Sequence, residues 1–387
     1  MGPRRPEIEY IHLENLAKLK KNGNNRSVHD AYEALHKLAR GALKKGPFSI
    51  TFDKKAPYIA ASGDKRDFIS YAPYWWPEDG KNAHDADIRY IRRDGHHNPD
   101  VKNAHDQRQM DDFSENLTYL VLGYFVFEKE EYGQHAVRLI DTFLLNEETR
   151  MNPNLNYGQV VRGKNNPSGL GRGEGIISTR SLARVANVLP LLESFKAYAK
   201  LKERLHAWFQ EYLHWLLTSP VTANAKKAIH NIHSWYVVHI TAIQGFVDSS
   251  HVHSHLRAFF SDILPKQIDR HTGDQPLESR RTRPLHYLMF NMKAVIYLAE
   301  MGRSIGLDFY HEPPALIQLA VDHIAHLAKQ TNEDVTGFVR EMEIMSHVYK
   351  DHHQLYGHFI HAARHSHFAE HISGPKNALA PLWSYKA

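Results

Sequence analysis

Two segments of the chain concentrate side chains that transfer protons and bind anions. They read IHNIHSWYVVH over residues 229–239 and RTRPLHYLMFN over residues 281–291. A tyrosine phenol can donate a proton, and beside a cation it can also accept one. The 387 residues include no cysteine, which excludes disulfides, thiolate metal sites and a cysteine nucleophile. Any chemistry therefore falls to His, Tyr, Arg, Asn and carboxylate side chains.

The composition indicates a folded protein with a polyanionic partner. Hydrophobic residues make up 42% of the chain, yet no apolar run approaches the ~20 residues that a membrane-spanning helix needs. The net charge is +5, and the 29 histidines add positive charge below about pH 6.5. Lys and Arg are mixed with acidic residues along the chain, and we find no recognised nucleic-acid motif. We therefore expect an anionic polymer other than nucleic acid, and no membrane.

Apolar residues recur near a 3.6-residue period over most of the chain, which predicts helices. The pattern fails in two long stretches, 47–106 and 150–177, where Asn, Gly, Pro and aromatic residues gather and where we expect structured, functional loops. Residues 47–52 (PFSITF) could form a short strand. The predicted helical segments are 7–46 (two helices), 110–128, 132–145, 178–198, 202–217, 234–247, 251–268, 284–305, 314–330 and 351–371.

Helices of ordinary length joined by short turns are typical of stacked antiparallel helix pairs. No repeat of constant length is present, so a regular solenoid is disfavoured. The sequence predicts an all-α fold, an incomplete (α/α) toroid of unequal helix pairs, in a single domain over residues 1–387. The two long loop stretches would form its cleft.

Five ordered segments resemble the alginate lyase superfamily, whose members include alginate and glucuronan lyases. The resemblance implies an α/α toroid with a deep cleft for an anionic polymer, in agreement with the helix pattern. It further implies polysaccharide lyase activity on a 1,4-linked uronic-acid polymer, without a cofactor or a metal. The segments are SGDKRDFISYAPYWWPEDG (62–80), YIRRDGHHNPD (90–100), RMNPNLNYGQ (150–159), GRGEGIISTRSL (171–182) and RTRPLHYLMFN (281–291).

The resemblance assigns the central roles to Tyr287 and Arg281. Such a lyase must neutralise the uronate carboxylate, remove the C5 proton and protonate the leaving 4-oxygen. Tyr287 matches the family's catalytic tyrosine, in an HY pair with His286 before a helix. Arg281 matches the arginine that contacts the substrate carboxylate or activates that tyrosine.

The second catalytic segment departs from the family text. Family members carry an asparagine and a histidine in an NNH stretch, and these neutralise the carboxylate or abstract the proton. Here Asn231 and His233 match if one residue is deleted after the histidine, whereas a gapless alignment places Ile232 on the histidine. We expect Asn231 and His233 to be the site residues, with His230 as the reserve.

The remaining expected substrate-binding residues lie mostly in the loop segments. Aromatic rings can stack on sugar faces, Lys and Arg can pair with neighbouring carboxylates, and amides can bond hydroxyls. The expected set is Lys65, Arg66, Tyr74, Trp75, Trp76, Arg92, Asn156, Gln159, Arg180 and His286.

Two other classes of function remain open from the residues alone. A hydrolase of unsaturated uronides would need a pair of carboxylates to protonate a double bond or activate water; Asp64, Asp67, Asp94 and Glu174 are available but show no such signature. A polysaccharide-binding protein without catalysis is the other class. The first ten residues lack an apolar signal segment, so we expect either an intracellular chain or, preferentially, a secreted or periplasmic protein whose signal is absent from this sequence. The preferred uronate and the oligomeric state stay open.

Overall fold

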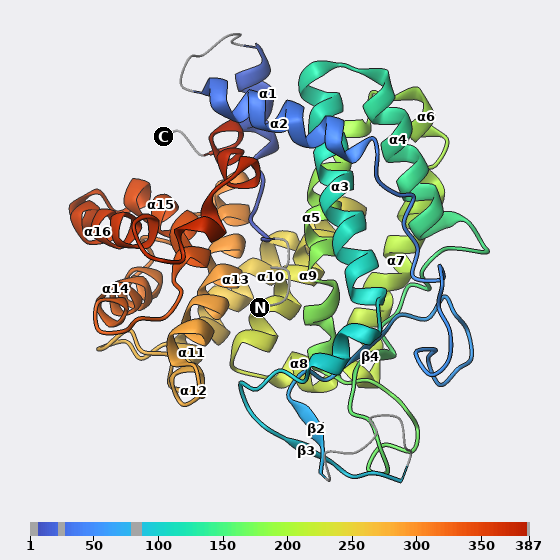
Figure 1. The fold of residues 1–387 in the computed structure, drawn as a ribbon. Coiled ribbons are helices and arrows are strands. Elements are labelled where there is room, and N and C mark those ends of the chain that lie inside the picture. The colour runs from blue at the N-terminus through green and yellow to red at the C-terminus, as the bar shows by residue number, and fades with distance from the viewer. Residues whose placement is uncertain (1–6, 22–27, 79–86, 385–387) are drawn as a thin grey trace. The chain divides into compact units, whose positions relative to one another are not determined.

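The computed structural model describes residues 7–21, 28–78 and 87–384. Helices dominate these residues and the strands are short, so the predicted all-α class is confirmed (Figure 1). None of the described helices is both long and apolar enough to span a membrane.

The chain forms two compact units, each described here by itself. Unit 1 comprises Met1–Ile8, Ala39–Ala228 and His239–Ser250, and unit 2 comprises Glu9–Leu38, Ile229–Val238 and His251–Ala387. Helices α2 (His29–Ala42) and α9 (Asn231–Val247) contribute residues to both units. The single domain expected over residues 1–387 stays a prediction.

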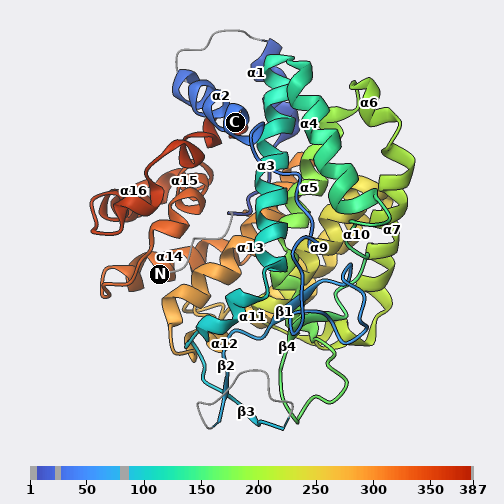
Figure 2. The same cartoon turned by 45° about the vertical axis from the view of Figure 1, so that its right-hand side comes forward.

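Unit 1 is organised around α3, which packs against α4 and α5 (Figure 2). Buried residues lie all around α3, including Met110, Phe113 and Leu117, because it has neighbours on several sides. Its other helices are shorter. The helices of unit 1 are α3 (Asp106–Phe127), α4 (Glu130–Ile140), α5 (Ser181–Val188), α6 (Lys196–Ala199), α7 (Lys202–Thr218) and α8 (Ala223–Lys227).

The helix predicted over residues 178–198 is interrupted. A 3-10 turn at Leu189–Leu192 separates α5 from α6. Pro190 lies in the first positions of that turn, and a proline cannot donate the backbone hydrogen bond that would continue α5. The apolar periodicity therefore predicted a helix here correctly, but it placed the end of that helix too far along the chain.

Among the described residues of unit 1, four short strands form two pairs. Strands β1 (Ile69–Tyr71) and β4 (Tyr157–Val160) are parallel, and β2 (Trp75–Pro77) and β3 (Tyr90–Arg92) are antiparallel. The strand predicted at residues 47–52 is wrong. There the Ser49 Oγ accepts a hydrogen bond from the Thr51 backbone N–H at 2.9 Å, and this local bond favours a turn over a strand.

A buried ion pair fastens the loop before β1 to the start of α3. Lys54 Nζ lies 2.7 Å from Asp106 Oδ2, and both side chains are almost fully buried. Lys54 also donates to the carbonyl oxygens of Lys65 and Asp67, and Asp106 accepts from the Ile69 backbone N–H. Because each group makes several hydrogen bonds, the pair can hold a loop that has no regular structure of its own.

Glycines in the second loop allow backbones to touch. A Cβ atom at Gly171 would lie 2.3 Å from the Gly158 carbonyl oxygen, and one at Gly175 would lie 2.8 Å from the Gly158 backbone. No side chain fits at these contacts. The glycine-rich loop therefore packs closely on β4.

Unit 2 is built on α13, which packs against α14, while α15 and α16 pack against each other. The sequence pattern missed α15. Pro284 opens α13, where its missing N–H costs nothing. The helices wholly in unit 2 are α1 (Leu13–Lys21), α10 (Val252–Ala258), α11 (Leu264–Gln267), α12 (Pro276–Ser279), α13 (Pro284–Ser304), α14 (Leu316–Ala328), α15 (Val339–Val348) and α16 (His353–Arg364).

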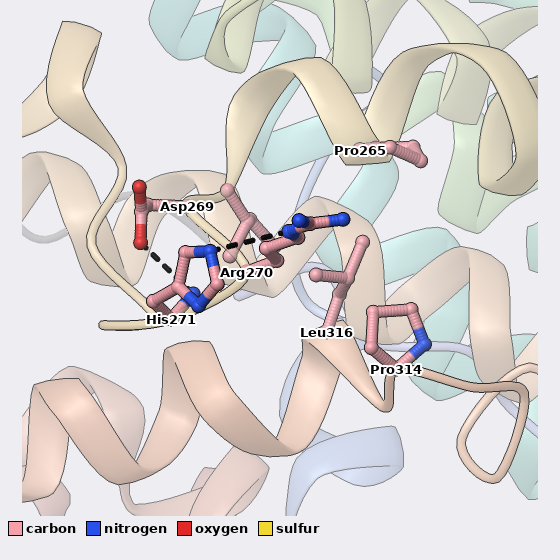
Figure 3. Close-up of a pocket in the computed structure, with 7 residues that line it drawn as sticks. Pro265, Asp269, Arg270, His271, Pro314 and Leu316 are labelled. Atoms are coloured by element: carbon pink, nitrogen blue, oxygen red, sulfur yellow. Dashed lines mark hydrogen bonds between the residues drawn. The ribbon is translucent and has the colours of Figure 1, made fainter.

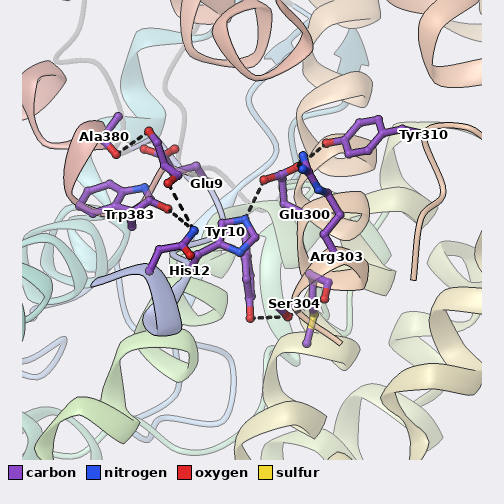
Figure 4. A network of polar contacts seen from close by, with 12 residues as sticks. Glu9, Tyr10, His12, Glu300, Arg303, Ser304, Tyr310, Ala380 and Trp383 are labelled. Carbon is purple, nitrogen blue, oxygen red and sulfur yellow. Dashed lines mark hydrogen bonds and ion pairs between the residues drawn. The ribbon is translucent and has the colours of Figure 1, made fainter. Parts of the chain in front are cut away.

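A buried polar network ties the segment before α1 to the end of α13 (Figure 4). Glu300 is 3% exposed, and its carboxylate lies 2.7 Å from His12 Nε2 and accepts a 2.8 Å bond from the Tyr310 hydroxyl. Tyr10 donates to Ser304 at 2.9 Å. Burial raises the pKa of Glu300, but the bond and charge of His12, with smaller contributions from neighbours, lower it below the ordinary value overall.

We predict that Glu300→Gln lowers the free energy of unfolding at pH 7 by about 1–3 kcal/mol. The folded-state pKa of Glu300 is lowered, so its contribution is present above about pH 4.5 and is lost as the pH falls through the lowered pKa. Urea unfolding at pH 7 and pH 3 should therefore show the gap between wild type and variant closing in acid. Glu211→Gln, at an exposed position on α7, is the control, and an equal loss in both variants would contradict the prediction.

Candidate active site

The first turn of α9 places the asparagine and histidines of the IHNIHSWY segment. His230 precedes the helix, and its Nδ1 lies 3.4 Å from the Ile232 backbone nitrogen as a cap of the helix start. Asn231 and His233 are 4% and 8% exposed, whereas Ile232 is half-buried. His230 therefore acts at the helix end, while Asn231 and His233 lie deeper in unit 2.

Asn231 is bound to a buried glutamate that the sequence analysis did not single out. Glu278, on α12, accepts a 2.7 Å bond from the Asn231 backbone N–H. The Asn231 Nδ2 lies 2.8 Å from each of the two Glu278 carboxylate oxygens. Burial raises the pKa of Glu278 above its ordinary value, although the bonds from Asn231 and the charge of Arg281 oppose that rise.

Arg281 and Tyr287 are in direct contact. The Arg281 guanidinium carbon lies 3.8 Å from the centroid of the Tyr287 ring, a cation–π geometry. The His286 ring meets the Tyr287 ring edge to face at 5.1 Å. Arg281 is half-buried and Tyr287 is 5% exposed. The two residues expected to carry the chemistry are therefore held together, with His286 beside them.

Aromatic rings surround His233 and the start of α13. The His233 ring lies nearly parallel to that of Phe259, with centroids 6.4 Å apart. Trp235 donates from Nε1 to the Phe290 carbonyl oxygen at 3.3 Å, and the two rings are 5.3 Å apart. These contacts fix the first turns of α9 and α13 within unit 2.

A chain of buried amide side chains, linked by hydrogen bonds, also holds the first turns of α9 and α13. Asn291 Nδ2 donates to Gln267 Oε1 at 3.0 Å and to Gln275 Oε1 at 2.8 Å. Gln267 in turn donates from Nε2 to the Ser234 hydroxyl at 3.0 Å. All four side chains are less than 5% exposed. Their bonds join α9, α11 and the residue before α12 to α13.

The expected aromatic residues of unit 1 lie on and beside the β2–β3 pair. Tyr74, Trp75 and Trp76 are each half-buried. The Tyr74 ring meets His97 edge to face at 5.0 Å, and Trp76 donates to the His96 carbonyl oxygen at 2.9 Å. Each of the three residues is therefore partly accessible, which a role in sugar binding requires.

The expected cationic residues differ in how far they are already bound. Arg66 donates to Asp64 through Nε and Nη2 and to the Glu147 carbonyl oxygen through Nη1. Its bonds lower the pKa of Asp64 to about 2. Arg92 makes a 2.7 Å bond to Asp94 with a half-exposed side chain, and Lys65 is exposed. Lys65 and Arg92 are thus more available to a ligand than Arg66.

The three remaining polar residues make bonds within unit 1. Asn156 Oδ1 accepts from Trp215 Nε1 at 2.7 Å, and Gln159 Oε1 accepts from Arg172 Nη2 at 3.0 Å. Gln159 has a positive φ of 51°, a strained conformation for a residue other than glycine. Arg180 donates to the Ile177 carbonyl oxygen at 3.1 Å.

His239, the last histidine of the 229–239 segment, lies in unit 1 and is fully buried. Burial, followed by the charge of Arg180, lowers its pKa to about 3. The ring is therefore neutral at physiological pH.

A surface hollow of about 510 Å³ lies elsewhere in unit 2 (Figure 3). None of the expected site residues lines it. Arg270 donates to the His271 ring at 3.2 Å, and Asp269 accepts from the His271 backbone N–H at 2.9 Å, so its polar groups stabilise a local turn. Across the described ranges, no cluster of three or more His, Asp or Glu side chains is arranged to hold a metal ion.

The family model described as alginate lyase matches residues 51–333. The chain belongs to the alginate lyase family. A solved alginate lyase from Bacteroides ovatus is 27% identical, with a TM-score of 0.83 over 98% of this chain and 100% of that one. Alginate lyase A1-III from Sphingomonas species A1 shares the fold alone, at 15% identity and a TM-score of 0.51 over 91% of this chain and 94% of that one. A comparison with curated proteins gives no match.

These likenesses confirm the fold class expected from the sequence, the helical toroid of the alginate lyases. They also agree with the resemblance of the five segments, four of which lie wholly within residues 62–182 and one in 281–291. In the first segment, Asp79 and Gly80 lie outside the described residues.

We predict that Asn291→Ala lowers the free energy of unfolding by about 2–3 kcal/mol, because it removes the donor to the buried Gln275 Oε1 and one of the two donors to Gln267 Oε1. Urea unfolding measures the midpoint at constant slope. Asn332→Ala, at an exposed position, should change the stability by less than about 0.5 kcal/mol. Equal effects of the two substitutions would show that the amide chain does not stabilise unit 2.

Proposed function

We propose that this family member is a polysaccharide lyase that cleaves a 1,4-linked uronic-acid polymer, with alginate as the leading substrate and glucuronan as the second. One observation carries the proposal: residues far apart in sequence meet in a single set of contacts. Asn231 bonds Glu278, 47 positions away, and Glu278 precedes Arg281, whose guanidinium covers the Tyr287 ring.

The reaction is a β-elimination. A base removes the C5 proton, the C5–H electron pair becomes the C4–C5 double bond, and the C4–O4 bond breaks. The leaving oxygen takes a proton from an acid, so the step needs no other reactant. Tyr287 is the acid in this proposal. It also acts as the base when it starts as a phenolate: the phenolate takes the C5 proton, and the phenol so formed protonates the leaving oxygen. The cationic Arg281 against the ring favours that phenolate.

Removal of the C5 proton is difficult because the adjacent carboxylate is already negative. The developing charge must be offset by groups that are in place before the reaction. Arg281 and His233 supply this neutralisation in the proposed site, and Asn231 and His286 contact the same sugar. Five N–H donors in a planar group suit Arg281 to a carboxylate.

Unit 1, taken by itself, also carries residues that suit the binding of an acidic sugar in this proposal. Lys65 and Arg92 pair with carboxylates, because their side chains are the more exposed cations of the expected set. Tyr74 and Trp75 offer ring surface to the sugar faces. The net charge of +5 attracts a polyanion at low ionic strength.

The carboxylates named from the sequence for a uronide hydrolase do not suit the role of its general acid. A general acid needs a raised pKa, but the pKa of Asp64 is lowered to about 2. Asp94 is paired with Arg92, and Glu174 lies 3.5 Å from Arg172. The secreted or periplasmic location and the single domain are part of this proposal and stay predictions.

We predict that Tyr287→Phe lowers kcat on alginate by about 10²–10⁴-fold, because it removes the proton donor and leaves the ring in place. The conjugated double bond formed by elimination absorbs ultraviolet light, so absorbance over time measures turnover. Alginate, polymannuronate and glucuronan should be compared, and the polymer with the fastest rise identifies the substrate.

Tyr124→Phe is the matched control, because it removes a hydroxyl from a half-buried tyrosine on α3, outside the proposed site. It should leave the rate within about twofold of wild type. Absence of any absorbance rise on the three polymers, despite measurable binding, would replace the lyase with a polysaccharide-binding protein.

A further inference from the structure

Glu278 makes more contacts with Asn231 than a helix cap requires. Its bond to the Asn231 backbone N–H places a negative charge at the start of α9, where an anion is favourable. That bond alone would explain a structural role. The two further contacts, from Nδ2 to both carboxylate oxygens at 2.8 Å, act on the side chain of Asn231 and set its orientation.

The Glu278 oxygens accept their hydrogen bonds from Asn231, so the side-chain atom of Asn231 that faces them is the amide nitrogen. Both side-chain bonds between the two residues run through Nδ2. The Asn231 Oδ1 therefore points away from Glu278 and is the atom that can meet a ligand. This orientation differs from the expectation, drawn from the family resemblance, that the Asn231 amide neutralises the substrate carboxylate.

We propose that Glu278 is a positioning residue that turns Asn231 so that its Oδ1 faces the polyuronate and accepts a hydrogen bond from a sugar hydroxyl. This inference rests on the proposed lyase function. A carboxylate of the substrate cannot donate a hydrogen bond to Oδ1, whereas a hydroxyl can. Neutralisation of the substrate carboxylate is then the task of Arg281 and His233.

Burial makes this arrangement effective. Glu278 is 2% exposed and Asn231 is 4% exposed, so water competes little for their bonds. The Arg281 charge partly offsets the Glu278 charge, which would otherwise repel an anionic substrate. Glu278 acts through Asn231 and need not touch the substrate itself.

The decisive experiment exchanges the two polar groups. In Asn231→Asp, two carboxylates face each other. In Glu278→Gln, the introduced amide faces that of Asn231 and favours turning Nδ2 toward the substrate. When both substitutions are combined, the introduced glutamine donates to the introduced aspartate and accepts from the backbone N–H of that residue, so an oxygen again faces the substrate. We expect each single variant to lower kcat by about 100-fold, and the double variant to recover to within about tenfold of wild type.

The exchange separates the two roles of Asn231. If Asn231 instead donates to the substrate carboxylate, the double variant has no donor and an added negative charge at that position. It would then be as inactive as Asn231→Asp, and this result would overturn the proposal. Glu300→Gln is the matched control: it also alters a buried, hydrogen-bonded glutamate of unit 2, and it should lower the melting temperature without changing kcat.

A second readout does not depend on activity. The side-chain amide protons of Asn231, assigned by nuclear magnetic resonance with the Asn231→Asp variant, should exchange slowly in wild type and in Glu300→Gln. They should exchange at least about tenfold faster in Glu278→Ala. Fast exchange in wild type would overturn the positioning role even if the enzyme is active. Slow exchange in a protein that turns over no polyuronate would instead count against the lyase function alone.

Discussion

The hydrogen bonds of Asn291 are the constraint on which the arrangement of the proposed site depends. Asn291 lies four residues after Tyr287 on α13, so the two side chains share a helix face. Its partner Gln275 lies three residues before Glu278, and Ser234, bonded to Gln267, lies three residues after Asn231. Each anchor is therefore about one turn from a candidate site residue. Because the anchors are fully buried, a shift of any one segment would leave an amide without its partner.

The proposed site combines charges of both signs on a chain with an excess of positive charge. Arg281 covers the Tyr287 ring, and its positive charge also acts on the buried Glu278 carboxylate, whose pKa it lowers against the effect of burial. An isolated cation would bind any anion. In the proposed site, Glu278 lies beside the cationic Arg281 and orients the Asn231 amide, which adds selection by hydrogen bonding. The long-range attraction brings a polyanion to the protein, and short-range bonds decide which sugar reacts.

The sequence predicted those features that repeat along one helix or lie close in one segment. Helical periodicity found α13 and α7 almost to their ends, and the contact of Arg281 with Tyr287 needs only six residues of chain. Glu278 was missed because its partner lies 47 positions away and no spacing rule links the two. Its place three residues before Arg281 was the one available signal. The strand expected at 47–52 failed for a local reason, since the Ser49 side chain bonds its own turn.

The hydrogen bonds of Asn231 offer a physical reason why Ile232 can stand where the family stretch has a polar residue. Isoleucine offers no polar side-chain atom, and Ile232 is half-buried in the first turn of α9. In the proposed orientation, Nδ2 of Asn231 is held by Glu278 and Oδ1 faces the ligand, so neither side chain is placed to neutralise an incoming carboxylate. Neutralisation in the proposed site is then the task of Arg281 and His233, and the Arg281 guanidinium contributes a full charge where an amide contributes only a dipole. A site of this kind tolerates Ile232 because charge stabilises the developing anion more strongly than the lost amide would.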